Sequence, residues 1–270
     1  MEKRMQETET FTFRREELFP LADRWRVSFL EAKPFRHVVI DDFLPPGALE
    51  PVLDEFPEPR DASWQQFDSS REIKLALSDT ERMGPATRNL LAEFNGQVFV
   101  EFLERLTGIE QLVSDPHFEG GGLHQIRPGG FLKVHADFNR HRRLNLDRRL
   151  NGLLYLNKDW EESYGGHLQL WDVDMTRCEH KILPVFNRFV VFATTDDANH
   201  GHPDPLTCPD DRARRSMALY YYTNGRPGEE TGDDHTTVFK RRPGEEWKSS
   251  FRQTIKRWTP PALVDLLARK

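Results

Sequence analysis

Residues 122–137 read GLHQIRPGGFLKVHAD, and this stretch carries the pattern that decides the fold. Two short apolar runs flank an Arg-Pro-Gly-Gly turn without helical spacing, which is typical of consecutive β-strands. The same pattern of short apolar runs and turns recurs at residues 148–160, 165–174, 181–195 and 214–225. Short strands at this spacing predict a mainly β fold with supporting helices, whose core is a double-stranded β-helix, or jelly roll.

The stretch before this core predicts the supporting helices. Residues 37–47, HVVIDDFLPPG, indicate a strand closed by a Pro-Pro-Gly turn. Apolar residues then recur at helical spacing in two places, first after Gly47 and again between Gly84 and Thr107. We therefore expect one short helix, followed by one or two longer helices, packed against the jelly roll.

The same patterns suggest a division of the chain. We expect a lead-in over residues 1–34 and a catalytic domain over residues 35–225, with its jelly roll at about 115–225 and its supporting helices within 46–108. Residues 226–270 form a C-terminal extension. It ends in TPPALVDLLARK, where two prolines can start a terminal helix.

Composition argues against several classes of protein. The 270 residues carry a net charge of -6 with well-mixed signs, which favours neither a nucleic-acid-binding nor a membrane-surface protein. A basic run at residues 140–143 is short and predicts a solvated loop. Cys178 and Cys208 form no CxxC pair, which argues against a disulfide framework or a thiolate zinc site. No signal peptide or membrane span is evident, so we expect a cytoplasmic protein.

The end of the strand FLKVHAD carries the first candidate metal ligands. His135 and Asp137 are two residues apart, and this spacing places their side chains on one face of a strand. A third ligand, His200 or His202, follows the apolar strand NRFVVFATT and a polar turn. Two imidazoles and one carboxylate form the facial triad of non-haem iron(II) oxygenases, which leaves coordination positions open.

A buried arginine would complete such a site. In RRSMALYYY, residues 214–222, strand alternation places Arg214 and Ser216 on one face and Arg215 on the other. An inward guanidinium matches a carboxylate in a bidentate manner, so a dicarboxylic co-substrate would satisfy Arg214. The alternatives are that Arg214 pairs with an Asp or Glu of the protein, or that Arg215 faces inward.

Residues 135–221 resemble the prolyl 4-hydroxylase-like branch of the 2-oxoglutarate and iron(II)-dependent oxygenases. Three motifs carry the likeness: YLNKDWEESYGGHLQLW at residues 155–171, PVFNRFVVF at 184–192 and RRSMALYYY at 214–222. The first resembles the branch's Tyr-Leu-Asn strand, acidic loop and Gly-Gly turn. The second is similar to the strand before its second histidine, and the third to the strand with its co-substrate arginine.

This resemblance implies a role for each candidate residue. His135, Asp137 and His200 correspond to the Fe(II) ligands, Arg214 to the residue that binds the far carboxylate of 2-oxoglutarate, and Tyr155 to a hydroxyl that helps hold it. His202 takes a position that is usually apolar in the family. Whether it assists or replaces His200 stays open.

The implied reaction consumes O2, converts 2-oxoglutarate to succinate and carbon dioxide, and hydroxylates a C–H bond, with stimulation by ascorbate expected. The carboxylate at Asp137 favours hydroxylation, since related halogenating enzymes have a small residue there.

Two stretches depart from the family pattern. A customary Tyr before the HxD strand is missing, and Gln125 or Arg127 is the candidate to take over its contact. Residues 138–152, FNRHRRLNLDRRLNG, form a longer and more basic insert than in compact members, which we expect to influence substrate choice.

The substrate is the least determined feature. A prolyl residue of a peptide or free proline fits the resemblance, and we expect the aromatic residues Phe131, Phe138, Trp160 and Trp171 to accommodate an extended chain. A small metabolite or a sugar-bearing intermediate is the alternative. Outside this chemistry, a zinc hydrolase and a metal-binding, cupin-like module without activity are further hypotheses.

Overall fold

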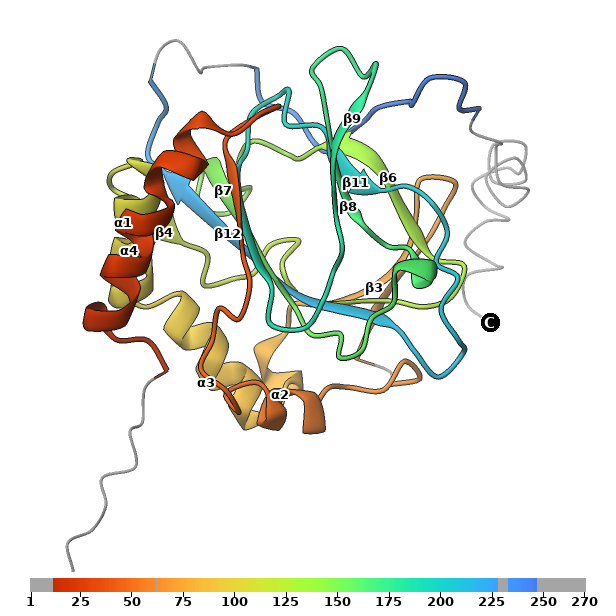
Figure 1. Ribbon diagram of the computed structural model, residues 1–270, viewed down its shortest axis with the longest axis horizontal. Helices are drawn as coiled ribbons and strands as arrows, with labels where there is room; N and C mark the ends of the chain where they lie inside the picture. The colour runs from red at the N-terminus through yellow and green to blue at the C-terminus, as the bar shows by residue number, and fades with distance from the viewer. Residues whose placement is uncertain (1–11, 62, 228–232, 247–270) are drawn as a thin grey trace, which may run out of the picture.

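The structure is a computed structural model that describes residues 12–61, 63–227 and 233–246 (Figure 1). The described part contains the α-helices α1 (Arg15–Glu31), α2 (Glu50–Asp54), α3 (Pro85–Phe94) and α4 (Gln97–Thr107), and the 3-10 helices η1 (Thr80–Arg82) and η2 (Glu162–Tyr164). None of these helices is long and apolar enough to cross a membrane. The predicted C-terminal helix at residues 259–270 lies outside the described residues.

Thirteen strands in the described residues form one curled sheet. They are β1 (His37–Ile40), β2 (Gln65–Asp68), β3 (Glu72–Leu77), β4 (Val113–Ser114), β5 (Gly122–Ile126), β6 (Phe131–Ala136), β7 (Asp147–Tyr155), β8 (Leu168–Trp171), β9 (Cys178–Ile182), β10 (Phe189–Ala193), β11 (His200–His202), β12 (Arg214–Thr223) and β13 (Val238–Phe239). The order is β1-β10-β7-β12-β5-β3-β6-β11-β8-β9, with β2 on β3, β4 on β12 and β13 on β6. The pairs are antiparallel, and the predicted mainly β, jelly-roll fold is confirmed.

The long strand β12 separates the hydrophobic core from a cavity inside the curl. Met217, Leu219 and Tyr221 belong to the main core cluster, together with the inner faces of α3 and α4. Arg214 and Ser216 line the cavity instead. This is the alternation expected from the sequence, because successive side chains of a strand point to opposite faces. One strand therefore anchors the core and presents the site.

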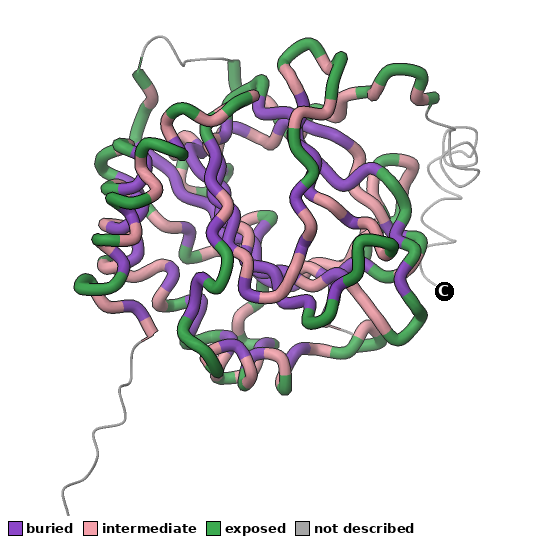
Figure 2. The backbone as a smooth tube through the Cα atoms, in the orientation of Figure 1, coloured by how far each residue is buried: buried purple, intermediate pink, exposed green. Residues whose placement is uncertain are grey.

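The helices cover the outer face of the sheet on one side (Figure 1). The apolar run between Gly84 and Thr107 forms two helices, because the chain leaves α3 at Asn95 and starts α4 after Gly96. The earlier lead-in contains α1, which packs against α4 and buries Phe29 completely. Buried residues follow the central strands and the inner helix faces, whereas exposed ones gather on outer loops (Figure 2).

Three features were not predicted. The range expected to hold supporting helices also contains the hairpin β2–β3, whose second strand pairs with both β5 and β6. The extension after residue 225 returns to the roll as β13 and pairs with β6 beside His135. The basic run at residues 140–143 is a turn as expected, but His141 inside it is 1% exposed and lies 3.1 Å from Asp115.

Candidate metal centre and co-substrate pocket

Three side chains with metal-binding groups meet where β6 pairs with β11. His135 lies directly opposite His200 in the antiparallel register, and Asp137 follows the end of β6. One ligand atom from each residue lies within 4.8 Å of the others. His135 Nε2 is 3.5 Å from Asp137 Oδ1, and His200 Nε2 is 3.4 Å from Asp137 Oδ2. The structure thus groups His200, rather than His202, with the HxD pair.

The backbone sets both histidines in the same tautomer. Nδ1 of His135 lies 2.8 Å from the carbonyl of Lys133, and Nδ1 of His200 lies 2.8 Å from the carbonyl of Ala198. A carbonyl can only accept, so each Nδ1 carries the hydrogen and each Nε2 keeps a lone pair toward the centre. Burial lowers the pKa of His200 to about 4, so the ring is neutral at pH 7 and able to bind a metal.

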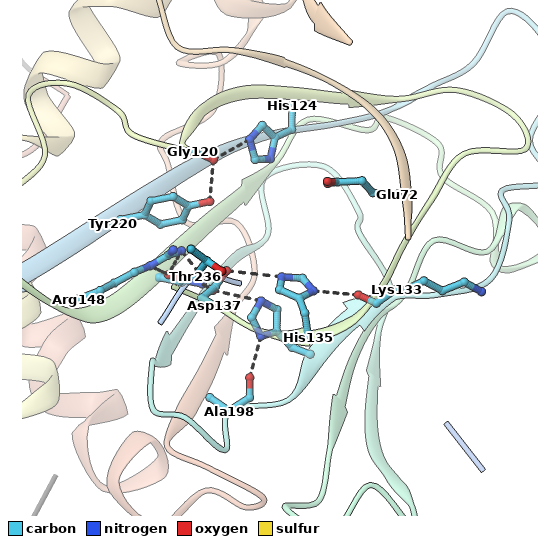
Figure 3. A network of polar contacts seen from close by, with 12 residues as sticks. Glu72, Gly120, His124, Lys133, His135, Asp137, Arg148, Ala198, Tyr220 and Thr236 are labelled. Atoms are coloured by element: carbon cyan, nitrogen blue, oxygen red, sulfur yellow. Dashed lines mark hydrogen bonds and ion pairs between the residues drawn. The ribbon is translucent and has the colours of Figure 1, made fainter. Parts of the chain in front are cut away.

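Two residues of β7 hold the carboxylate of Asp137, and Figure 3 shows one of them, Arg148, beside it. Asn151 Nδ2 donates to Asp137 Oδ2 at 2.7 Å, and Arg148 Nη2 lies 3.2 Å from the same oxygen. Arg148 Nε and Nη2 also donate to Asn151 Oδ1 at 2.9 and 2.6 Å. Burial would raise the pKa of Asp137, but Arg148 and the two histidines hold it well below its ordinary value. The carboxylate is therefore charged and fixed.

Arg148 reaches this position through a bulge that the sequence pattern did not reveal. Counted back from Tyr155, alternation points to Asn151 and Arg149. In the structure Tyr221 pairs with Leu150 but Tyr222 pairs with Arg148, so Arg149 is an extra residue in β7. The guanidinium of Arg148 is fully buried, 3.5 Å from the ring centroid of Tyr220.

The second half of the site surrounds Arg214. Its Nε donates to the carbonyl of Gly166 at 2.8 Å, and its Nη2 donates to the hydroxyl of Tyr155 at 3.2 Å. The Gly-Gly turn allows this approach, because Gly166 has a φ of +73° and an added Cβ would lie 3.0 Å from Arg214 Cδ. Tyr155 is fully buried, and burial raises the pKa of its hydroxyl, which stays protonated.

Arg214 has no carboxylate partner in the described part of the chain, where its polar contacts are the carbonyl of Gly166 and the hydroxyl of Tyr155. It is 4% exposed, and burial lowers the pKa of its guanidinium. Arg215, by contrast, is only half-buried and points away from the cavity. Of the two alternatives to a co-substrate arginine, the first finds no partner in the described residues and the second is wrong.

The triad and Arg214 open into one cavity of about 390 Å³. Aromatic rings from four separate parts of the chain line it, together with two pairs of opposite charge; these residues are Phe67, Phe138, Tyr220, Phe239, Glu72 with Lys74, and Glu119 with Arg142. The hairpin β2–β3 and strand β13 thus supply part of the wall. Distant pairing brings them there, and no local pattern indicated it.

Several sequence predictions about the pocket need correction. Neither Gln125 nor Arg127 lines the cavity, which β5 instead lines with His124 and Ile126. Gln125 alternates away from it and is fully buried. Of the aromatic residues expected beside a substrate, Phe138 lines the cavity, whereas Phe131, Trp160 and Trp171 do not. His202 lines it and is 4% exposed.

The donor set fits an iron ion with a dicarboxylic co-substrate. Two imidazole nitrogens and one carboxylate can act as three ligands on one side, and the cavity occupies the other side. Arg214, which has no carboxylate partner in the described residues, provides a site for a carboxylate in the same cavity. A closed four-ligand zinc site is not formed by the described residues.

Comparisons with known proteins agree with this geometry. The sequence model of the 2OG-Fe(II) oxygenase superfamily matches residues 121–242. No curated protein matches the sequence. Among solved structures, a prolyl hydroxylase from Trichoplax adhaerens, in complex with a hypoxia-inducible-factor peptide fragment, is 19% identical with a TM-score of 0.57, covering 77% of this chain and 91% of its own.

Two further structures share the fold. A prolyl-4-hydroxylase from Pseudomonas putida is 19% identical with a TM-score of 0.53, covering 77% of this chain and 100% of its own. HygX from Streptomyces hygroscopicus, solved with nickel, 2-oxoglutarate and hygromycin B, is 13% identical with a TM-score of 0.50. The match covers 80% of this chain and 96% of HygX. The matching segment contains the triad and Arg214. The sequence of residues 121–242 is thus similar to the 2OG-Fe(II) oxygenase superfamily, and the solved structures share the fold of this chain.

Proposed function

We propose that this protein is a hydroxylase in which His135, Asp137 and His200 hold Fe(II), and Arg214 with Tyr155 binds the far carboxylate of 2-oxoglutarate. The observation that carries the proposal is the presence of both halves in one cavity. A complete His-Asp-His group and a buried arginine without a carboxylate partner in the described residues share it.

The protein's own groups orient the reactants. When bound, iron supplies the oxidative chemistry that couples decarboxylation of 2-oxoglutarate to C–H hydroxylation. Asn151 and Arg148 hold Oδ2 of Asp137, so the carboxylate that would bind the metal is fixed in orientation. Because Arg214 already donates to the oxygen of Tyr155, the phenolic hydrogen is free to be donated to a carboxylate.

For the substrate, we propose a prolyl residue of a peptide or free proline. The aromatic rings of Phe138, Tyr220 and Phe239 offer apolar contacts to a saturated ring. Apart from Arg214 and the group around Asp137, the charged side chains of the cavity lining form ion pairs with each other, Glu72 with Lys74 at 3.1 Å and Glu119 with Arg142 at 3.7 Å. The prolyl hydroxylases that share the fold support this class.

A small metabolite or sugar-bearing compound is the second candidate. The likeness to HygX, solved with hygromycin B, favours it, as do the polar side chains of Gln65 and Thr237 in the cavity lining. Both candidates require the same iron and co-substrate chemistry. They differ only in what occupies the remaining cavity, so one assay with two sets of substrates separates them.

The first experiment measures co-substrate turnover. Purified protein with Fe(II), ascorbate and 2-oxoglutarate is expected to form succinate, and 2-oxoglutarate is expected to raise the melting temperature of the metal-loaded protein. The His135→Ala variant serves as the matched control without turnover. If the wild-type protein forms no succinate and shows no thermal shift, the proposed chemistry is wrong.

The second experiment identifies the substrate class. The enzyme is incubated with a peptide digest of a proteome and, separately, with free proline and a panel of aminoglycosides and sugars. Formation of 4-hydroxyproline, measured by mass spectrometry, supports the prolyl proposal. Succinate formation that rises only with the sugar-bearing compounds would favour the second candidate.

A further inference from the structure

His202 is a buried histidine that the site described so far does not use. It lies on β11 two residues after His200, with Gly201 between them, and both imidazoles line the cavity. Gly201 lets β11 lie close to β6, since an added Cβ would meet the carbonyl of Leu132 at 2.9 Å. The β11–β6 register shifts between His200 and His202, and His202 pairs with Leu132.

The imidazole of His202 has no hydrogen-bond partner in the described residues. It is 4% exposed, and both Nδ1 and Nε2 are buried without a donor or acceptor in reach. A buried polar group without a partner is costly and rare in folded proteins. His124 in the same cavity differs, because its Nε2 lies 3.1 Å from the carbonyl of Gly120. Among the described histidines that line the cavity, His202 is therefore the one whose two ring nitrogens both lack a partner.

The charges around His202 indicate what kind of group is missing. Arg214 and Lys74 are the cations that act most strongly on it, and Arg214 has no carboxylate in the described part of the chain. A neutral imidazole carries one N–H donor. His202 and Arg214 line the same cavity, so that donor suits an anion that the guanidinium attracts into it.

We infer that His202 donates its N–H to the carboxylate of 2-oxoglutarate that Arg214 binds. The inference rests on the proposed function, and it adds a third donor to Arg214 and Tyr155. It also explains why a polar ring stands where the resembling family has an apolar residue. The co-substrate would supply an acceptor for the N–H of His202.

The test compares two 2-oxo acids on Ni(II)-loaded protein. Binding of 2-oxoglutarate is measured by calorimetry, and binding of 2-oxopentanoate by thermal shift at millimolar concentration. The second acid keeps the 2-oxo end and the chain length but has a methyl group in place of the far carboxylate. His202→Leu is expected to weaken 2-oxoglutarate binding by about tenfold and to leave 2-oxopentanoate binding unchanged within about twofold.

Two more variants separate this role from folding. His202→Gln keeps an N–H donor and is expected to stay within about threefold of wild type for 2-oxoglutarate. His37→Leu removes a buried histidine of β1 that already has a partner, the carbonyl of Phe35, and that does not line the cavity, so it is expected to leave co-substrate affinity unchanged. Melting temperatures of the metal-free proteins show whether each variant is folded.

Three outcomes would overturn the inference. They are an unchanged 2-oxoglutarate affinity in His202→Leu, an equal loss for both 2-oxo acids, and an equal loss in His37→Leu. Failure of the proposed function looks different. In that case wild-type, Ni(II)-loaded protein binds no 2-oxoglutarate at all, whatever residue stands at position 202.

Discussion

The two ends of the cavity treat buried charge in opposite ways. At the metal end, the carboxylate of Asp137 has a cation, Arg148, and an amide, Asn151, within 3.2 Å. At the other end, the guanidinium of Arg214 contacts only neutral oxygens in the described residues. A buried charge without a countercharge is unfavourable, so the protein satisfies one end itself and leaves the other for a ligand.

This difference suits two tasks, the orientation of a metal-binding side chain at one end and the recognition of a small molecule at the other. A metal ligand must be held in place before the metal arrives, and the contacts from β7 would do this for Asp137, the carboxylate ligand that we propose. A co-substrate anchor must instead keep its charge available. Loss of Asp137 should therefore lower the stability of the ligand-free protein, whereas loss of Arg214 should not.

The largest effect is expected for Asp137→Ala. The variant loses a metal ligand and leaves Arg148 buried without its carboxylate, which costs about 3 kcal/mol of unfolding free energy. We expect more than about 100-fold loss of Fe(II)-dependent succinate formation and a lower melting temperature. The double variant Asp137→Ala/Arg148→Met should recover most of the stability but none of the turnover. Equal stability of the single variant and wild type would contradict the pairing.

Arg214→Met should behave in the opposite way in the absence of ligand. It removes a buried charge that has no carboxylate partner in the described residues, so the metal-free protein should melt at or above the wild-type temperature. Without this donor, the dissociation constant of 2-oxoglutarate should rise about thirtyfold or more. Calorimetry on Ni(II)-loaded protein measures the affinity. A marked drop in stability of the metal-free variant would show that Arg214 is a structural residue.

Asn151→Ala tests the orientation of Asp137 with its charge partner still present. The variant removes the 2.7 Å hydrogen bond to Oδ2 but keeps Arg148. We expect metal affinity, measured by titration with Mn(II), to fall by about tenfold. The affinity of the metal-saturated protein for 2-oxoglutarate should change little. Asn151→Asp replaces the amide with a like charge beside Asp137. The affinity of the apo protein for Mn(II) should then be weaker than in Asn151→Ala. Unchanged Mn(II) affinity in both variants would remove Asn151 from the metal centre.

The smallest effect concerns Glu245, which ties the segment after β13 to β6. Its carboxylate lies 2.5 Å from Lys133 Nζ. Burial would raise the pKa of Glu245, but hydrogen bonds from Lys133 and Arg242 outweigh burial and leave it below 4.5. A lowered folded pKa means that the stabilisation is present above about pH 4.5 and is lost as pH falls through the folded value.

Urea unfolding of wild type and Glu245→Gln measures this contribution. The wild type should be more stable by about 1 kcal/mol at pH 7, and the difference should shrink toward zero below pH 4.5. A difference that persists unchanged at pH 3 would show that packing, and not the charge, accounts for it.

Local patterns were sufficient for much of the fold and for the centre of the site. Strand alternation placed Arg214 toward the inside and Arg215 away from it, and the spacing of two put His135 and Asp137 on one face. These predictions depend only on the period of a β-strand, which the sequence carries directly. The same period could not separate His200 from His202, since both fall on one face.

Tertiary structure decided everything that depends on register. The pairing of β11 with β6 sets His200 opposite His135, and a single extra residue at Arg149 turns Arg148 toward Asp137. The hairpin β2–β3 and strand β13 reach the cavity from segments about 60 residues before and 100 residues after His135. A bulge and a distant strand pairing are fixed by contacts between elements, so no single stretch of sequence contains them.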